Sequence, residues 1–363
     1  MLPYLVLYYA ELNIPGRLIG ILTALPPLVS LVGAPLWTGV ADATHRHRLV
    51  LTLSLLFSIV SILAFMTVTS FWALLFLIVM FAFSISPGNS LADSATMFML
   101  GDETEKYGRV RVGGTFGWAV ASLIAGVVIQ KAGLISSFYM YSIYMALALL
   151  VGLRLVFSRV EGHVSVTRGI KALVSQPRWI LFLSMSFIVG IALAVVNTYL
   201  LYYMGELGAS KSMMGIAMVV ATVSEIPILF FSDRLITRFK AYGLFVLGFL
   251  FTGIRLLLLA FVNQPESAVA LQLLQGFTYP IIWVAGVSYA SKNAPVGINA
   301  TAQGLFGSMI MGFGAAAGNF LGGFLIDAYS SQFMFLAIGA AEIAFLVIFA
   351  LVEKRLPGQS KSI

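Results

Sequence analysis

The stretch LYYAELNIPGRLIG, residues 7–20, returns in altered form as LYYMGELGASKSMMG, residues 201–215. Glu11 of the first copy corresponds to Glu206 of the second, at an offset of 195 residues. Since the chain has 363 residues, this offset is slightly more than half of its length. A repeat at this distance predicts two duplicated halves that are related to each other in parallel.

The composition indicates what kind of halves these are. Hydrophobic residues make up 60% of the chain and charged residues only 10%, with a mean hydropathy of +1.00. Soluble proteins carry about 25% charged residues. The sequence therefore predicts an integral membrane protein. The chain has no cysteine, which removes disulfides and thiolate chemistry from consideration.

The number of membrane spans follows from the apolar runs, because a transmembrane helix needs about 20 apolar residues. Eleven segments meet this requirement: 18–41, 49–68, 71–97, 112–129, 137–157, 179–204, 213–231, 241–262, 268–290, 301–326 and 333–352. A polar stretch separates the first five from the last six. The prediction is an all-α membrane protein with four parts: an N-terminal bundle at 1–157, a linker at 158–178, a C-terminal bundle at 179–352 and a tail at 353–363.

The first helix needs separate treatment. Residues 1–9, MLPYLVLYY, are apolar and aromatic but reach only about half of a span. Counting them as the outer half of a helix gives six helices in each half. We therefore expect two pseudo-symmetric six-helix bundles with an apparently truncated first helix. A short interfacial tail is the alternative interpretation.

The placement of Lys and Arg orients the chain in the membrane. If the linker is cytoplasmic, loops on its side contain most of the 21 Lys and Arg residues, whereas the opposite side holds Arg17, Lys131 and Lys211. The positive-inside rule favours this arrangement. We expect a multi-pass plasma-membrane protein, in a bacterium the inner membrane, with a cytoplasmic linker and C-terminus. The net charge of +7 is then an orientation signal, and we expect no nucleic-acid partner.

Small residues give a second match between the halves. One span has them at every fourth position: Gly113, Gly117, Ala121 and Ala125. The other has the same rhythm 197 residues later: Gly314, Gly318 and Gly322. Such a face lets helices approach closely. Static packing is one interpretation, but equivalent positions in both halves favour a moving seam, as in an alternating-access transporter. We therefore assign Gly113, Gly117, Gly314 and Gly318 to a conformational gate.

Charged residues inside the spans are candidates for function, because a charge at the bilayer centre costs about 2.5–3.5 kcal/mol on insertion scales. Asp93 and Arg111 lie nine residues before and after Asp102, the centre of the turn between their helices. At a rise of about 1.5 Å per residue, they lie at the same depth on adjacent helices. We expect an ion pair. Asp93 then serves as a solute or proton ligand held by Arg111, and a purely structural pair is the alternative.

Three further charges lie within spans. Glu225 and Arg255 differ in predicted depth by roughly 10 Å, so we expect them to face a shared cavity rather than each other. Glu342 is expected to be structural. A carboxylate whose proton affinity changes as a cavity opens and closes is able to couple transport to a proton gradient. Asp93 and Glu225 are the candidates for this coupling.

Enzyme chemistry has little support in the sequence. The three histidines, His45, His47 and His163, lie in predicted loops. No metal-spaced cluster and no Ser-His constellation lies within the membrane. GGTFG, residues 113–117, is no phosphate loop, because it lacks a following Lys-Ser or Lys-Thr. We expect neither an enzyme nor a cofactor.

Two six-helix halves, a basic loop after the second helix and a long central linker resemble the major facilitator superfamily. The loop TGVADATHRHR, residues 38–48, keeps Asp42, Arg46 and Arg48 of that superfamily's signature but departs from it at Thr38, Ala43 and His45. The resemblance implies the fold and a gating role for Asp42 and Arg46.

YGRVRVGGTFGW, residues 107–118, is similar to the segment of lactose permeases that begins Phe-Gly-Arg-Ala-Arg and ends Gly-Trp. By this resemblance, Asp93 and Arg111 take the places of a substrate-binding acid–arginine pair. Trp118 takes that of a tryptophan that stacks on a sugar ring. Arg255 corresponds to an arginine of helix nine, and Glu225 lies about one turn from an acidic residue of helix eight.

SEIP at 224–227, QLLQGFTYP at 272–280 and NAPVGINATAQGL at 293–305 look like the lactose-permease-like branch that includes nucleoside and phenylpropionate proton symporters. The proton relay of that family is not preserved. Gln275 replaces the usual His, Thr278 a proton-carrying Glu, and Gln272 a Lys. Coupling would therefore rest on Asp93 or Glu225.

The sequence thus predicts a secondary transporter that moves a small organic solute by alternating access, coupled to protons. We expect a sugar, nucleoside or aromatic acid as solute, and a monomer in the lipid bilayer. The predicted solute-binding residues are Asp93, Arg111, Trp118, Asn197, Glu225, Arg255, Gln272 and Gln275. The alternatives are an uncoupled facilitator, a drug exporter of the same fold, or a receptor or scaffold that transports nothing.

Overall fold

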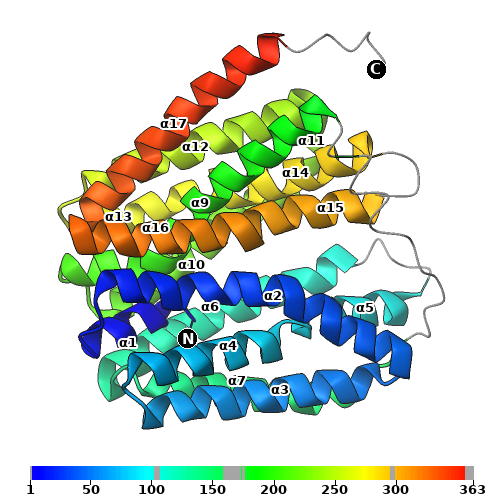
Figure 1. The fold of residues 1–363 in the computed structure, drawn as a ribbon, viewed down its shortest axis with the longest axis vertical. Helices are drawn as coiled ribbons and strands as arrows, with labels where there is room; N and C mark the ends of the chain where they lie inside the picture. Colours follow the sequence, from blue (N-terminus) through cyan, green and yellow to red (C-terminus); the bar gives the residue numbers. More distant parts are fainter. Residues whose placement is uncertain (1, 102–106, 158–172, 174–175, 295–298, 356–363) are drawn as a thin grey trace.

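The computed structural model of the chain describes residues 2–101, 107–157, 173, 176–294 and 299–355. All regular elements in these residues are helices, and they form two bundles that lie against each other (Figure 1). Ten helical segments in this part of the chain are long and apolar enough to cross a membrane, and Ser136–Gly152 is a shorter apolar helix. Each of the eleven predicted spans overlaps one of these segments. The predicted all-α membrane fold is confirmed.

The first bundle precedes the predicted linker, most of which lies outside the described residues. Its helices are α1 (Leu5–Glu11), α2 (Gly16–Thr44), α3 (His47–Ala64), α4 (Phe71–Ile85), α5 (Gly88–Leu100), α6 (Tyr107–Ala132) and α7 (Ser136–Gly152). The apolar residues 1–9 thus contribute a short helix, α1, which is buried and packs against the second bundle at α9.

The second bundle contains the remaining helices, which occupy the upper half of Figure 1. They are α9 (Pro177–Glu206), α10 (Lys211–Phe230), α11 (Ser232–Phe239), α12 (Ala241–Ala260), α13 (Pro265–Leu271), α14 (Tyr279–Asn293), α15 (Asn299–Gly307), α16 (Ala315–Ala328) and α17 (Ser331–Arg355). A 3-10 segment, Gln272–Phe277, joins α13 to α14, and a π-helical segment, Ser308–Gly314, joins α15 to α16.

Two of the predicted continuous spans are broken helices, and proline explains both breaks. Pro87 lies between α4 and α5, and Pro280 lies in the first turn of α14. Proline has no N–H with which to continue the backbone ladder. Irregular backbone is tolerated at membrane depth where it is buried in protein or lines a cavity. Pro87 is buried in protein, whereas Gln272, Gln275 and Pro280 line a cavity.

The two halves meet along two seams, α2 with α16 and α6 with α10. A Cβ on Gly323 would lie 2.5 Å from the Cα of Gly20, and a Cβ on Gly126 would lie 3.0 Å from the Cα of Gly215. Only glycine permits such backbone contact. The two seams are related by the sequence repeat, because Gly215 follows Gly20 by 195 residues and Gly323 follows Gly126 by 197.

The four glycines assigned to the gate lie elsewhere. Gly113 and Gly117 have open space beside them. Gly314 packs against the carbonyl oxygen of Phe187, 2.7 Å from a Cβ built on the glycine, and Gly318 packs against Ile191. Both contacts are with α9, in the same half. Successive residues on a helix point about 100° apart, so the seams lie one residue beyond the predicted rhythm, at Gly126 and Gly323.

Each seam is also linked by one hydrogen bond from a helix N-terminus to a side chain of the other half. The backbone N–H of Gly16 donates to Asp327 Oδ1 at 3.1 Å, and that of Lys211 donates to Gln130 Oε1 at 2.7 Å. The first N–H groups of a helix have no partner within the helix. Here they are satisfied across the interface, at equivalent positions of the repeat.

In the described residues, the halves share a hydrophobic cluster at one end. The largest hydrophobic cluster contains buried residues of both halves, among them Leu22, Phe138, Tyr203 and Leu259. A second cluster around Phe182 and Phe306 contains Leu173 of the predicted linker and otherwise residues of the second half, and a third around Leu51 and Leu55 lies in the first half. We call the end with the shared cluster, at the loops 12–15 and 207–210, the closed end. The end at which α3 and α9 begin is the open end.

Glu342 carries a buried carboxylate outside the interface. It lies on α17 with 1% of its surface exposed, and both carboxylate oxygens are without a hydrogen-bond partner in the described part of the chain. Burying a polar group without a partner costs about 1–3 kcal/mol. The site is packed against Gly253 of α12.

We predict that Glu342→Leu, which conserves volume approximately, raises the melting temperature of the purified protein by a few degrees. Thermal unfolding in detergent is the measurement, with Glu11→Leu at an exposed carboxylate as the control expected to change little. A lower melting temperature for Glu342→Leu would mean that Glu342 has a polar partner in the folded protein.

Candidate functional site

A cavity of about 980 Å³ lies between the two halves. Its wall contains residues of α2, α5 and α6 from the first half and of α9, α10, α12 and α14 from the second. At the closed end the wall includes Leu22, which belongs to the shared cluster. Towards the other end it includes Thr96 and Val110, beside the turn between α5 and α6. The cavity is therefore covered at the closed end and reaches towards the open end.

Seven of the eight predicted solute-binding residues line this cavity: Asp93, Trp118, Asn197, Glu225, Arg255, Gln272 and Gln275. The eighth, Arg111, lies on α6, but its side chain lies outside the described residues. The predicted pair of Asp93 with Arg111 falls there too. The structure thus brings together residues from five helices and the 3-10 segment.

Arg255 is the centre of a polar cluster on the second half's wall. It is 1% exposed, although its helix, α12, is otherwise apolar. Its guanidinium donates to Gln275 Oε1, to Gln272 Oε1 at 2.5 Å, and to Thr278 Oγ1 at 3.4 Å. Buried charges persist when hydrogen bonds satisfy them. The 3-10 segment provides such bonds by presenting both glutamines to the same guanidinium, whose Nε alone has no partner in the described residues.

Gln275 also connects Arg255 to Glu225. Its Nε2 donates to Glu225 Oε1 at 3.0 Å while its Oε1 accepts from Arg255. Glu225 and Arg255 share the cavity, as the sequence predicted, and one neutral amide links them. A side-chain amide has both donors and an acceptor, so Gln275 is able to bond to both charges at once. The cluster is held in place by Ser224, which accepts from the N–H of Gly276 at 3.0 Å.

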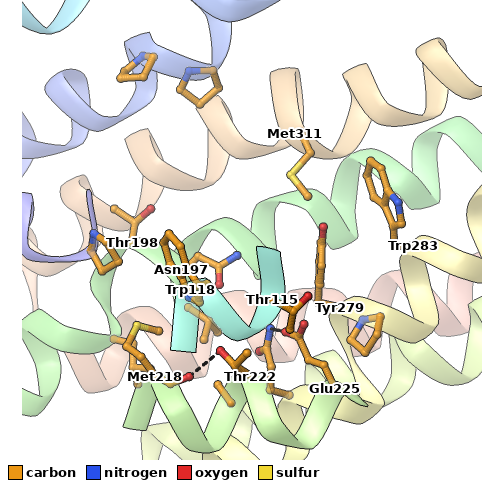
Figure 2. Close-up of a pocket in the computed structure, with 18 of the residues that line it drawn as sticks. Thr115, Trp118, Asn197, Thr198, Met218, Thr222, Glu225, Tyr279, Trp283 and Met311 are labelled. Atoms are coloured by element: carbon orange, nitrogen blue, oxygen red, sulfur yellow. Dashed lines mark hydrogen bonds between the residues drawn. The ribbon is translucent and has the colours of Figure 1, made fainter. Parts of the chain in front are cut away.

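Aromatic side chains lie on both walls of the cavity. Trp118 lies on α6 and is 48% exposed, and Figure 2 shows it together with Thr115 across from residues of α9, α10 and α14. Tyr279 and Trp283 of α14 have stacked rings, with centroids 6.1 Å apart. Aromatic faces of this kind accept a flat or ring-shaped solute by stacking.

Among the cavity residues that were not predicted are Thr115, Thr222, Trp283 and Met311. A sequence signal existed for three of them. Thr115 precedes Trp118 by three residues, Thr222 precedes Glu225 by three, and Trp283 follows Tyr279 by four. Residues three or four apart share a helix face. Met311 lies in the π-helical segment, whose geometry the periodicity of an α-helix does not describe.

The two residues of the predicted loop that were assigned to the gate lie where α2 meets α3: Asp42 is in the last turn of α2 and Arg46 directly precedes α3. Asp42 Oδ1 lies 2.8 Å from Nε2 of His47, and the His47 ring stacks on Phe157. Arg46 is exposed at the N-terminus of α3. At the open end, His47 is therefore the side chain that pairs with Asp42. In the described part of the chain, no group of His, Asp and Glu side chains is suited to hold a metal ion.

Comparison with known proteins gives consistent results. The family described as MFS_1 like family matches residues 1–337. The chain is 25% identical to the maltose permease of Geobacillus stearothermophilus over 98% of its own length and 91% of that protein. It is also 25% identical to the uncharacterized transporter YwbF of Bacillus subtilis, over 95% of this chain and 87% of that one.

Among solved structures, the nucleoside transporter NupG is similar to this chain with a TM-score of 0.86 and 19% identity. The match covers 98% of this chain and 95% of that one. At this identity the likeness concerns the fold, and it agrees with the two bundles described above.

Proposed function

This chain belongs to the MFS_1 like family, and from that premise we propose that it imports a neutral, ring-shaped polar solute, a sugar or a nucleoside, together with protons. The relatives are transporters rather than enzymes, and the helices cross a membrane several times. The chain is accordingly a multi-pass membrane transporter of small molecules. The identity of the solute and the coupling to protons are the proposal.

The cavity between the halves carries this proposal. One wall presents neutral amides and hydroxyls around a single internal Arg255–Gln275–Glu225 chain, and the other presents Trp118. A solute with several hydroxyl groups matches the mixed donors and acceptors of the first wall. A ring matches the second by stacking. The names of the relatives, a maltose permease and a nucleoside transporter, support the same classes.

Alternating access supplies the mechanism. The cavity is covered at the closed end by the shared hydrophobic cluster and by the two glycine seams. Rocking of the halves about these seams would close the open end and expose the cavity at the other. Because the two seams are equivalent in the repeat, both change in the same way during such a motion. Asp42 and Arg46, at the open end, are proposed to act on closure there.

Protons are proposed to enter through Asp93 and Glu225, the two carboxylates in the cavity wall. Both become exposed to whichever side the cavity faces. Glu225 is bonded to Gln275, so movement of the Gln275 amide changes how strongly the carboxylate holds a proton. The central linker and the C-terminus are proposed to lie in the cytoplasm, where the positive-inside rule places them.

Uptake into proteoliposomes tests the proposal. A labelled panel of disaccharides, nucleosides and aromatic acids is offered with and without a pH gradient, acidic outside. One pH unit stores about 1.4 kcal/mol per proton. For a symporter carrying one proton, we therefore expect about tenfold accumulation of a sugar or nucleoside in the wild type, and none for Asp93→Asn.

The matched control is Asp233→Asn, at an exposed carboxylate of α11, which is expected to accumulate solute like the wild type. Uptake that equilibrates without responding to the gradient would make the protein an uncoupled facilitator. Accumulation by Asp93→Asn equal to the wild type would remove Asp93 from the proton pathway.

A further inference from the structure

Pro27, inside α2, leaves a backbone acceptor unpaired at membrane depth. An α-helix bonds each N–H to the carbonyl four residues earlier, and proline has no N–H. The carbonyl of Thr23 therefore receives no bond from position 27. In a bilayer an unsatisfied carbonyl is costly and is satisfied by a neighbouring helix or side chain. Thr23 lies beside the α2–α16 seam, three residues beyond Gly20.

Asn319 satisfies this carbonyl from the other half of the protein. Its Nδ2 donates to the Thr23 carbonyl oxygen at 2.8 Å, from α16 to α2. Its Oδ1 accepts from Thr198 Oγ1 of α9 at 2.7 Å, and the Tyr199 hydroxyl donates to its carbonyl oxygen at 2.5 Å. Tyr199 also lies 3.3 Å from Thr23 Oγ1. One buried amide thus joins three helices across the seam.

These residues also belong to the cavity. Thr23, Thr198 and Asn319 all line it, while Asn319 itself is 6% exposed. They lie where α2, α9 and α16 meet. A solute that bonds to Thr198 or Asn319 therefore acts on the same hydrogen bonds that hold α2.

The other seam has no proline at the corresponding position. By the offset of 195, Pro27 corresponds to Thr222 and Thr23 to Met218. The Met218 carbonyl accepts from Thr222 Oγ1 at 2.8 Å, within α10 (Figure 2). By the offset of 197, Asn319 corresponds to Ser122. The proline and its asparagine partner are therefore a feature of the α2–α16 seam alone within this pair of seams.

We propose that Asn319 is a positioning residue for transport, which holds α2 to the second half while the cavity faces the open end and releases it when the halves rock. The proposal rests on the alternating access proposed above. Because Asn319 also lines the cavity, a bound solute is able to alter the contact that holds the halves together at the closed end. Its partner is the acceptor that Pro27 leaves free, so its effect depends on that proline.

The experiment uses spin labels, and the native chain has no cysteine to remove. Labels at Thr69→Cys and Asn263→Cys, both exposed in loops of the closed end, report the separation of the halves by pulsed electron spin resonance. Loss of one hydrogen bond shifts the equilibrium between the closed and separated states about five- to tenfold. We expect Asn319→Ala to raise the population separated at the closed end by at least about fivefold. Asn319→Asp, which keeps the acceptor and loses the donor, should act in the same direction.

Pro27→Ala makes the test specific, because it restores an N–H that satisfies Thr23 within α2. In this background we expect Asn319→Ala to change the population less than about twofold, since coupled residues are not additive. Ser122→Ala, at the equivalent place in the other seam, should leave the distances unchanged. Wild-type distances in Asn319→Ala, or an equal effect in both backgrounds, would overturn the proposal. These distances need no solute, so failure of the uptake assay would reject the proposed cargo or coupling without bearing on Asn319.

Discussion

Replacing Arg255 with leucine is expected to reduce uptake to about 1% of the wild-type rate or less. The guanidinium donates hydrogen bonds to both Gln272 and Gln275. A hydrogen bond to a charged group contributes about 1.5–3 kcal/mol, and two such bonds correspond to a factor of 100 or more. Without them, both amides lose their orientation, and Gln275 no longer holds Glu225 in place.

Arg255→Lys discriminates between charge and geometry. Lysine keeps the positive charge but lacks the planar fork that bonds to two amides at once. We expect it to recover less than about a tenth of the uptake rate. Arg154→Leu, at an exposed position after α7, is the control for loss of a positive charge. Uptake by a folded Arg255→Leu protein within about threefold of the wild type would show that the cluster does not act in transport.

Replacing Gly323 with leucine is expected to hold the protein in the state in which the two halves are separated at the closed end. A Cβ at this position would meet the backbone of Gly16 and Gly20 across the seam, at 2.5 Å from the Gly20 Cα. Backbone is unable to move aside as a flexible side chain does, so the helices must part. Overpacking costs about 1–3 kcal/mol, which corresponds to a population shift of about 5- to 150-fold.

The label pair Thr69→Cys and Asn263→Cys measures this population shift directly. Uptake should fall by at least about tenfold, because the protein rarely returns to the state in which the closed end is shut. Gly243→Leu is the matched control, since a Cβ at Gly243 meets open space. Gly215→Leu, in the equivalent seam, should behave like Gly323→Leu. Unchanged distances in Gly323→Leu would mean that the seam adapts without separation of the halves.

The fold was predictable from the sequence, because bilayer thickness imposes a length on every span. The sequence also placed the two halves, since the repeat is visible at 7–20 and 201–215. The breaks inside spans were not predicted. The predicted spans 71–97 and 268–290 run through Pro87 and through Gln272–Phe277, because a count of apolar residues does not detect a change of backbone.

The cavity residues were predictable to a large extent for a related reason. Polar and charged groups within spans usually face a cavity or the bundle interior, and Asp93, Glu225 and Arg255 do line the cavity. How they connect was not predictable. Comparing depths along one hairpin sets Glu225 and Arg255 apart, whereas Gln275 reaches both from a third helix.

The seam glycines show the limit of predicting helix contacts from the spacing of small residues. Several small residues follow one another along α6, and a shift of one residue turns the face by about 100°. The four-residue spacing of small residues therefore identified the two equivalent helices, α6 and α16. It selected the wrong face, however, because Gly314 and Gly318 pack inside their own bundle. Choosing the correct face requires knowing which neighbour each face meets.

The apolar cluster shared by the halves lies at one end only, and this has a consequence for heat capacity. Burial of apolar surface lowers the heat capacity, and its exposure raises it. Parting the halves at the closed end therefore carries a heat-capacity change of its own, and apolar burial weakens on cooling. The balance between the two states is then a curved function of temperature. We therefore expect the populations of the two states to change with temperature even in the absence of solute.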